Sequence, residues 1–312
     1  MVNNMTNSHW ENVICNLCKG KDYRILFKST YDPEIVEKKF AQYSVYTDIV
    51  KCTKCGFVYE TPREKADIIT KRLRMESYPI KEHAIEERAL SFKKYIDSMK
   101  KNIPFQGKLL DLGCNIGDFL HLAKKEGVEI YGIEPSVFAA EKAMNLFGIK
   151  VINDLVDNAV MNLPDDFFDI VTLWDVIEHF LDPLDILCKV NKKMKKGAYI
   201  CIATHNIDSQ FSKITGSWYP HLMYQHFYHF SDKTIKEMSS RAGYEVVKIE
   251  VFNKMWSIRF LLGLLKEFFP RNRFLCSISD IGINLVTFLR IQNIIITIPV
   301  YNDMRVYARR KN

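Results

Sequence analysis

Apolar and polar positions alternate in blocks along residues 108–204, and the blocks switch between two periods. Short apolar runs typical of buried strands occupy 108–113, 129–136, 150–153, 169–175 and 198–204. Between them, residues 117–127, 137–148 and 182–197 space their apolar side chains as amphipathic helices do. Strands that alternate with helices form a parallel sheet covered on both faces. The pattern therefore predicts a doubly wound α/β domain.

Small and acidic residues follow the first of these strands, in the stretch LLDLGCNIGDFL at 109–120. Right-handed crossovers place ligands at the carboxyl ends of such strands, and Gly113 and Gly117 allow a sharp turn there. Asn115 and Asp118 stand where a dinucleotide fingerprint has glycines, so no close approach of a pyrophosphate is predicted.

Two acidic residues narrow the choice of ligand. Asp111 disfavours a phosphate beside the turn and favours an amino group, whereas Glu134 ends the next strand at a spacing suited to ribose hydroxyls. A cofactor with an ammonium group, a ribose and no phosphate fits these residues, and S-adenosylmethionine is such a cofactor.

Five motifs in order resemble those of class I S-adenosylmethionine-dependent methyltransferases, across about residues 107–250. They are LLDLGCNIGDFL, YGIEPS, FFDIVTLWDVIEHFLDP, KMKKGAYICIATHN and HFYHFSDKTIKEMSSRAGYEVV. The resemblance implies a Rossmann-like, mostly parallel seven-stranded sheet that ends with strands at 244–252 and 304–310. It also implies a cofactor site formed by Asp111, Gly113, Cys114 and Gly117 at the methionine part, Glu134 at the ribose, Asp154 and Leu155 at the adenine, and Trp174 and Asp175 beside the sulfonium.

Methyl transfer to an oxygen acceptor needs a base that titrates near neutrality, and histidine is the usual one. We predict His226 as the first candidate, because its segment follows the fifth strand, and His179 as the second. Either residue is equally well explained as a hydrogen-bonded structural histidine. Glu178 and His179 together are also candidate ligands for a divalent ion.

Four of the eight cysteines form two C-x-x-C pairs, Cys15 with Cys18 and Cys52 with Cys55. In an intracellular protein such pairs indicate a metal site, and four thiolates suit a structural zinc ion. Buried or redox-active cysteines are the alternative. The pairs also resemble the zinc-binding segment that precedes the methyltransferase domain in some members, including sugar C-methyltransferases.

These patterns divide the chain into four parts. We predict a zinc-binding module at 1–61, a helical connector or lid at 62–105, a cofactor-binding domain at 106–254 and 301–312, and an apolar helical insertion at 255–300. The apolar runs of the insertion are shorter than the ~20 residues that cross a bilayer. It is expected to form a cap, a homodimer surface or a peripheral membrane contact.

Composition restricts partner and location. The net charge of +7 favours acidic or anionic partners but is too diffuse to indicate nucleic acid. The polar first twenty residues lack a secretory pattern, so we expect a cytoplasmic protein with membrane association as an option. The function expected is methyl transfer to a small-molecule or glycan acceptor, with lipid-linked envelope acceptors included. The alternatives are a zinc-containing binding protein that keeps the fold without turnover, and a nicotinamide-dependent oxidoreductase, which the missing glycines disfavour.

Overall fold

The computed structural model describes residues 9–32, 45–75, 77, 82–268, 273–291 and 294–311. Its strands are β1 (Trp10–Glu11), β2 (Tyr23–Phe27), β3 (Ile49–Cys52), β4 (Val58–Glu60), β5 (Arg63–Glu64), β6 (Lys108–Leu112), β7 (Glu129–Ile133), β8 (Phe168–Trp174), β9 (Met194–His205), β10 (Tyr228–His229), β11 (Tyr244–Ser257) and β12 (Ile295–Arg310). Its helices are α2 (Ala66–Met75), α3 (Glu82–Asn102), α4 (Asp118–Lys125), α5 (Val137–Phe147), α6 (Val156–Met161), α7 (Pro183–Lys193), α8 (Gln210–Thr215), α9 (Asp232–Arg241), α10 (Ile258–Phe268) and α11 (Arg273–Phe288), with 3-10 turns η1 (Ile177–His179) and η2 (Gly216–Trp218).

A six-stranded sheet in the order β11-β12-β9-β8-β6-β7 forms the centre of the molecule. The four strands from β9 to β7 are parallel, and β12 runs antiparallel between β9 and β11. The α/β class and the mostly parallel sheet are thereby confirmed. The predicted count of seven strands is not met in the described residues, because the short run at 150–153 makes only an isolated bridge between Ile152 and Ile133.

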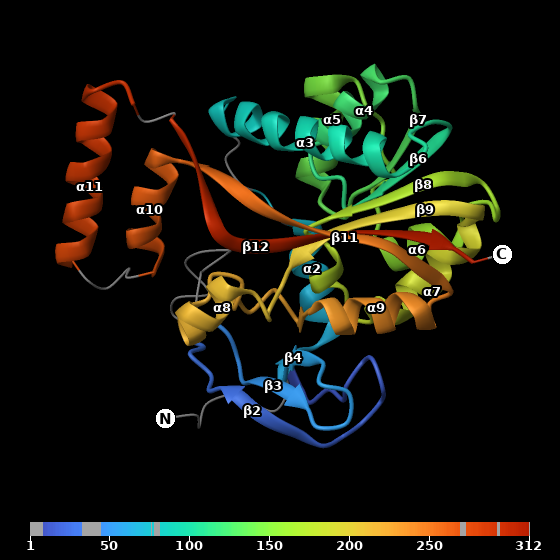
Figure 1. Ribbon diagram of the computed structural model, residues 1–312, viewed down its shortest axis with the longest axis horizontal. Helices are drawn as coiled ribbons and strands as arrows, with labels where there is room; N and C mark the ends of the chain where they lie inside the picture. Colours follow the sequence, from blue (N-terminus) through green and yellow to red (C-terminus); the bar gives the residue numbers. More distant parts are fainter. Residues whose placement is uncertain are drawn as a thin grey trace.

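Helices cover both faces of this sheet, with α3, α4 and α5 on one side and α6, α7 and α9 on the other (Figure 1). Neighbouring residues of one strand supply the two cores: Leu109 packs with α3 and α4, whereas Leu110 packs with α6 and α7. This alternation follows from the two-residue period of a strand. It explains why the strands read as continuous apolar runs.

The N-terminal segment shares a core with the central domain. A second sheet has the order β10-β4-β3-β2. Three of its strands come from the N-terminal segment, before residue 61, and the fourth, β10, comes from the chain after β9. Phe57 stacks on Tyr228 of β10 with ring centroids 5.5 Å apart. Cys15, Leu17 and Phe57 belong to the same buried cluster as Leu110. The predicted domain boundaries remain predictions, but the packing joins the segment tightly to the sheet.

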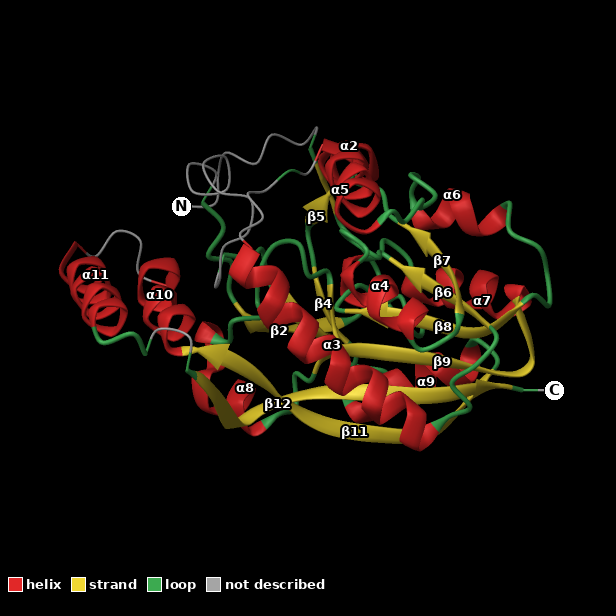
Figure 2. Cartoon of the chain, turned by 90° about the horizontal axis from the view of Figure 1, so that it is seen from above, coloured by secondary structure: helices red, strands yellow, loops and turns green. Residues whose placement is uncertain are grey.

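Two helices, α10 and α11, lie between β11 and β12 and stand beyond one end of the sheet (Figures 1 and 2). The range 255–300 predicted as a helical insertion contains α10 and α11, and at its ends Met255 and Ser257 pair with Thr297 and Ile295 as strand residues. Residues 269–272 and 292–293 of that range lie outside the described residues. Within the part of the chain that is described, no helix has the length and apolar character needed to cross a membrane.

Candidate active site

A cavity of about 290 Å³ opens at the carboxyl ends of β6, β7 and β8. This is the edge at which a doubly wound sheet is expected to bind ligands. Of the residues predicted to hold the cofactor, the cavity is lined by Asp111, Gly113, Cys114, Glu134, Leu155, Trp174 and Asp175. Gly117 and Asp154 are not among the lining residues.

The turn between β6 and α4 forms one wall. Gly113 has φ +68°, and a Cβ there would come within 2.8 Å of Val176. Gly117 has φ +77° and starts α4, and its nearest neighbour for a Cβ would be Ala143 of α5 at 3.2 Å. Gly113 is therefore required at the cavity, whereas Gly117 allows α4 and α5 to pack closely.

Glu134 fixes the shape of this wall. One carboxylate oxygen accepts a hydrogen bond from the backbone N–H of Asn115 at 2.8 Å, and the other accepts from the N–H of Ser136 at 2.9 Å. Ser136 in turn caps α5, with its side chain accepting from the N–H of Ala139. Asn115 has φ +50°, which is uncommon for a residue other than glycine and is tolerated here by the Glu134 contact.

Asp111 places a second carboxylate in the cavity. It is 2% exposed and accepts a hydrogen bond from Thr172 Oγ1 at 2.6 Å. Burial raises its pKa well above the ordinary value, and the nearby carboxylates of Asp118 and Glu134 add to the shift. Burial likewise raises the pKa of Glu134, against the two backbone hydrogen bonds that lower it. Both groups are thus poised to gain from a ligand that carries positive charge or hydroxyl donors.

Helices α2 and α3 supply the cover of the cavity, and their arginines are already paired. Arg88 of α3 holds Asp118 with Nε and Oδ2 2.9 Å apart, and Arg72 of α2 holds Glu64 with Nη2 and Oε1 2.6 Å apart. Both arginines line the cavity. Because each is paired with a carboxylate, neither offers an unpaired cation to a phosphate. The sequence does not identify either arginine as a cavity residue. The residues of α2 and α3 carry no pattern that shows which helical turn packs against the loop after β6.

Trp174 and Asp175, at the end of β8, both line the cavity. Trp174 is 9% exposed, and its indole Nε1–H is buried without a hydrogen-bond partner in the described residues. Asp175 has φ +55°, so it shares with Asn115 a positive φ that is uncommon for residues other than glycine. Asp154 instead faces Arg74, with Oδ1 and Nη2 2.6 Å apart, while its neighbour Leu155 reaches the cavity.

The two candidate bases differ in their access to the cavity. His179 lines the cavity, whereas His226 is 7% exposed and packs behind it, with ring centroids 4.7 Å apart. Burial lowers the pKa of His226 well below its ordinary value, and neighbouring histidines lower it further. Glu178 and His179, the predicted candidate ligands of a divalent ion, lie next to His226. One possible ligand atom from each of the three residues lies within 4.8 Å of the other two.

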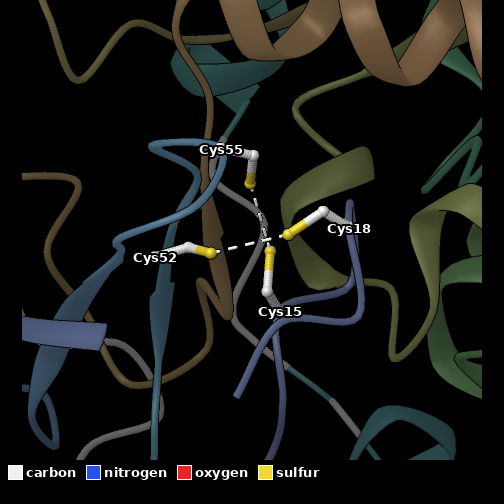
Figure 3. Close-up of side chains that lie close together, drawn as sticks. All are labelled: Cys15, Cys18, Cys52 and Cys55. Atoms are coloured by element: carbon white, nitrogen blue, oxygen red, sulfur yellow. Dashed lines mark hydrogen bonds between the residues drawn. The ribbon is translucent and has the colours of Figure 1, made fainter. Parts of the chain in front are cut away.

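The four paired cysteines converge on one point (Figure 3). The sulfurs of Cys15 and Cys55 are 3.4 Å apart, those of Cys18 and Cys52 are 3.5 Å apart, and all four cysteines are free thiols. Each pair sits in a tight backbone loop, closed by Cys15 N–H to the Gly20 carbonyl and by Cys52 N–H to the Phe57 carbonyl. Four sulfurs at these separations match the donor set of a tetrahedral zinc ion.

A profile of the family described as "Methyltransferase domain" matches residues 56–249, which is more than half of the 312-residue chain. The chain belongs to this family. The matched range contains every residue that lines the cavity.

Individual relatives match shorter stretches. The chain is 28% identical over 140 residues to a tRNA U34 carboxymethyltransferase of Desulfotalea psychrophila, covering 39% of this chain and 43% of that protein. It is 32% identical over 119 residues to phosphoethanolamine N-methyltransferase 1 of Arabidopsis thaliana, covering 36% of this chain and 23% of that protein. A ubiquinone biosynthesis O-methyltransferase of Yersinia pestis is 27% identical over 123 residues, with 37% of this chain and 50% of that protein covered.

The chain therefore spans half or less of the length of these curated relatives. Among solved structures, it is similar to a SAM-dependent methyltransferase of Archaeoglobus fulgidus at 22% identity and a TM-score of 0.49, with 79% of this chain and all of that chain covered.

The buried carboxylate of Asp111 predicts a pH-dependent gain in stability for Asp111→Asn. Because folding raises its pKa, the contribution of Asp111 to stability falls as the pH rises above about 4, the ordinary value of an unfolded aspartate. Asparagine keeps an acceptor for Thr172 and carries no charge, so the variant should unfold at a higher temperature than wild type at pH 7.5. The gap should shrink as the pH falls towards 5 in thermal melts without ligand. A variant that is less stable than wild type at pH 7.5 would contradict this account of Asp111.

Proposed function

We propose that this protein transfers a methyl group from S-adenosylmethionine to a small-molecule or glycan acceptor. The observation that carries the proposal is the pair of buried carboxylates, Asp111 and Glu134, in one cavity of a methyltransferase-family domain. The two arginines that line the same cavity are committed to Glu64 and Asp118. This charge arrangement favours a ligand with an amino group and hydroxyls over a phosphate-bearing dinucleotide.

The residues present fit the cofactor by the chemistry of their donor set. Glu134 would hold the ribose hydroxyls with the acceptor capacity that its two oxygens retain beyond the backbone bonds, and Asp111 would face the ammonium group. Leu155 would flank the adenine, and Trp174 the sulfonium end. When bound, S-adenosylmethionine supplies an already activated methyl group, so the protein's contribution is mainly to orient the acceptor.

We assign to His179, which lines the cavity, the role of taking a proton from an oxygen acceptor. Its Nδ1 lies 2.9 Å from the backbone carbonyl of Gln225, and a carbonyl can only accept, so Nδ1 carries the hydrogen. Nε2 then holds a lone pair and can act as a base. His226 lies behind His179, and we assign it a supporting position.

The acceptor class follows from neither the family nor the relatives. Those relatives are named for a tRNA uridine, for phosphoethanolamine and for ubiquinone biosynthesis, which are three unlike chemistries. The rival function, a binding protein without turnover, predicts the same cofactor site but no demethylated product. Incubation with S-adenosylmethionine and a panel of nucleotide-sugars and lipid-linked sugars, with S-adenosylhomocysteine as readout, distinguishes the two.

Loss of the Glu134 carboxylate should weaken cofactor binding. Glu134→Ala removes charged hydrogen-bond acceptors, so the Kd for S-adenosylhomocysteine should rise roughly 10- to 100-fold in calorimetry. Glu129→Ala is the matched control, because Glu129 lies exposed at the other end of β7 and should bind as wild type does. Equal affinities of the two variants, or binding of NADH in place of either sulfur ligand, would contradict the proposed cofactor.

We also propose that Cys15, Cys18, Cys52 and Cys55 bind a structural zinc ion. The convergence of four thiols at the base of the N-terminal sheet supports the proposal. The ion would join the loop before β2 to the loop after β3, and both loops pack into the core shared with the sheet. A site with four protein ligands has no open position for a substrate, so its role is in folding.

Replacing two of the four ligands should release this zinc and lower stability. The double variant Cys52→Ser/Cys55→Ser should contain one zinc ion fewer per chain than wild type and should melt at a lower temperature. Cys276→Ser, which changes a cysteine of α11 outside the cluster, should retain the full metal content. An unchanged zinc content in the double variant would exclude this site.

The outer face of α11 supports a lipid-linked acceptor. Five large apolar residues, three or four positions apart, form one exposed stripe on this helix, which we call the α11 stripe: Phe274 71% exposed, Ile278 40%, Ile281 67%, Leu285 54% and Phe288 84%. The opposite side is bound to α10, where Ser279 Oγ donates to the Leu262 carbonyl at 2.8 Å. Residues three and four apart lie on one side of a helix, so the stripe is continuous.

We propose that the α11 stripe lies on an anionic membrane surface. Exposed Arg273 and Arg290 stand at its two ends, and the chain as a whole carries +7. An amphipathic helix with an apolar face and basic flanks is suited to the lipid headgroup region, whereas a second copy of this chain would bring like net charges together. The described residues of α10 and α11 do not line the cavity, so a cap over the ligand receives no support.

The α11 stripe should direct the protein to anionic vesicles in a salt-dependent manner. Wild type should sediment with phosphatidylglycerol vesicles at low salt and less at high salt, because ions screen the arginines. Phe274→Ser/Phe288→Ser should abolish sedimentation, whereas Met161→Ser, which changes an apolar residue of α6 that is 60% exposed, should not.

No sedimentation at low salt would contradict the membrane assignment. Concentration-dependent dimers in analytical ultracentrifugation, lost in the same double variant, would assign the stripe to a second copy instead.

A further inference from the structure

Behind the cavity, four histidines and two carboxylates gather in one buried cluster. His205 ends β9, His229 lies in β10, and His221 and His226 lie in the segment between η2 and β10. The residue exposures are 0% for His205 and His229, 8% for His221 and 7% for His226, with 0% for Glu178 and Asp303. Apart from the supporting position of His226, neither the proposed methyl transfer nor the cysteine site uses this cluster, and such a concentration of polar groups away from water is costly unless they are paired or bind an ion.

Three of these imidazoles are arranged around a common point. One ring nitrogen each of His205, His221 and His226 lie within 4.8 Å of one another. Around a tetrahedral ion with bonds of about 2.0–2.1 Å, the nitrogens would be about 3.3 Å apart, so binding requires the side chains to move inward and the rings to turn toward the ion. The ring of His205 is nearly parallel to those of His221 and His226, with centroids 4.7 and 5.2 Å away.

Each of the three rings also has one nitrogen held by an outer group. His205 Nε2 is 2.9 Å from His229 Nδ1, His226 Nδ1 is 2.9 Å from the backbone carbonyl of His221, and His221 Nε2 is 3.5 Å from Asp303 Oδ1. Metal-binding histidines characteristically have their second nitrogen oriented by a carbonyl, carboxylate or another polar group. For His226, the carbonyl fixes the hydrogen on Nδ1 and leaves Nε2 as an electron-pair donor.

Three buried atoms of His205, His229 and Glu178 lack a hydrogen-bond partner within the described residues. They are His205 Nδ1, His229 Nε2 and Glu178 Oε1, and the first and last of these form an ion pair at 3.6 Å, longer than a hydrogen bond. The other oxygen of Glu178 is fixed by Thr204 Oγ1 at 2.9 Å, so Oε1 is held toward the histidines. A carboxylate oxygen and a ring nitrogen that are both buried without a hydrogen bond are atoms that a bound cation would satisfy.

From these contacts we propose that His205, His221 and His226, with Glu178 as a carboxylate ligand, bind a divalent transition-metal ion. Imidazole and carboxylate donors suit Zn²⁺ and its neighbours such as Co²⁺ or Fe²⁺ better than Mg²⁺ or Ca²⁺, which prefer all-oxygen sites. The ion is separate from the one assigned to the cysteines, and the proposal does not depend on methyl transfer.

The site ties together parts of the chain that form the acceptor side of the cavity. It links the end of β9 and the turn η1 to the segment 219–227, from which Gln225 and Phe227 reach the cavity. Gln225 orients His179, and the His179 ring contacts His226. The ion would therefore act as a positioning element for His179 and for that wall.

Metal counting with matched variants tests the proposal. Wild type is dialysed against Zn²⁺ and then against metal-free buffer. Elemental analysis by inductively coupled plasma mass spectrometry should then find two zinc ions per chain. His221→Ala should hold one, and so should Cys52→Ser/Cys55→Ser. His121→Ala, which changes a partly exposed histidine that stacks on Phe147 outside the cluster, should hold two.

Cobalt identifies which ion remains. Co²⁺ bound by thiolates shows strong sulfur-to-metal charge-transfer absorption, whereas Co²⁺ bound by imidazole and carboxylate shows only weak visible bands. His221→Ala should keep the charge-transfer absorption, and the cysteine double variant should lose it while it retains the weak bands.

Wild type alone also decides the question if a variant fails to fold. A folded wild type that takes up one Co²⁺ per chain, with all of its absorption of the thiolate type, overturns the histidine site and leaves the cysteine site standing. Uptake of one ion without thiolate absorption supports the histidine site and excludes the cysteine site.

Discussion

The carboxylate of Glu134 is the constraint on which the rest of the cavity depends. It joins the backbone of the β6–α4 turn to the residue that caps α5, so two loops from neighbouring strands are fixed by one side chain. Burial destabilises its charged form, and hydrogen bonds from two backbone N–H groups offset part of this destabilisation. The remaining acceptor capacity points to hydroxyl groups of a ligand. The same side chain thus organises the turn and, in the proposed function, would bind the ribose hydroxyls.

The N-terminal cysteine segment and the cavity are connected through β10. This strand pairs with β4, and the chain immediately before it carries Gln225 and Phe227 into the cavity. Phe57, one residue before β4, stacks on Tyr228 in the shared core. Metal binding at the cysteines would therefore stabilise the acceptor wall without contacting the ligand. The histidine cluster approaches the same wall from the end of β9.

Charge is distributed unevenly between the surface and the interior. The chain carries +7 overall, yet the cavity contains two buried carboxylates and its arginines are paired. A cationic cofactor in the cavity and an anionic membrane at the α11 stripe are compatible within one molecule, because the described residues of α10 and α11 do not line the cavity. The apolar stripe lies on a helix that packs against α10 beyond one end of the sheet, so docking there leaves the cavity free.

The sequence by itself determined the order of strands and helices, the acidic strand ends and the four paired cysteines. These features depend on short-range patterns: period-two and helical spacing, and residues placed directly after a strand. Asp111 and Glu134 are predictable in this way, because the carboxyl ends of parallel strands must meet at one edge.

Only the tertiary structure decided which histidine reaches the cavity, since His179 and His226 both lie near strand ends and differ only in how residues 219–229 fold back. It also decided that β10 pairs with β4, that the run at 150–153 forms a bridge instead of a seventh strand, and that Arg72 and Arg88 cover the cavity. These outcomes depend on contacts between residues that are far apart in the chain. The energies of such contacts cannot be predicted from short-range sequence patterns.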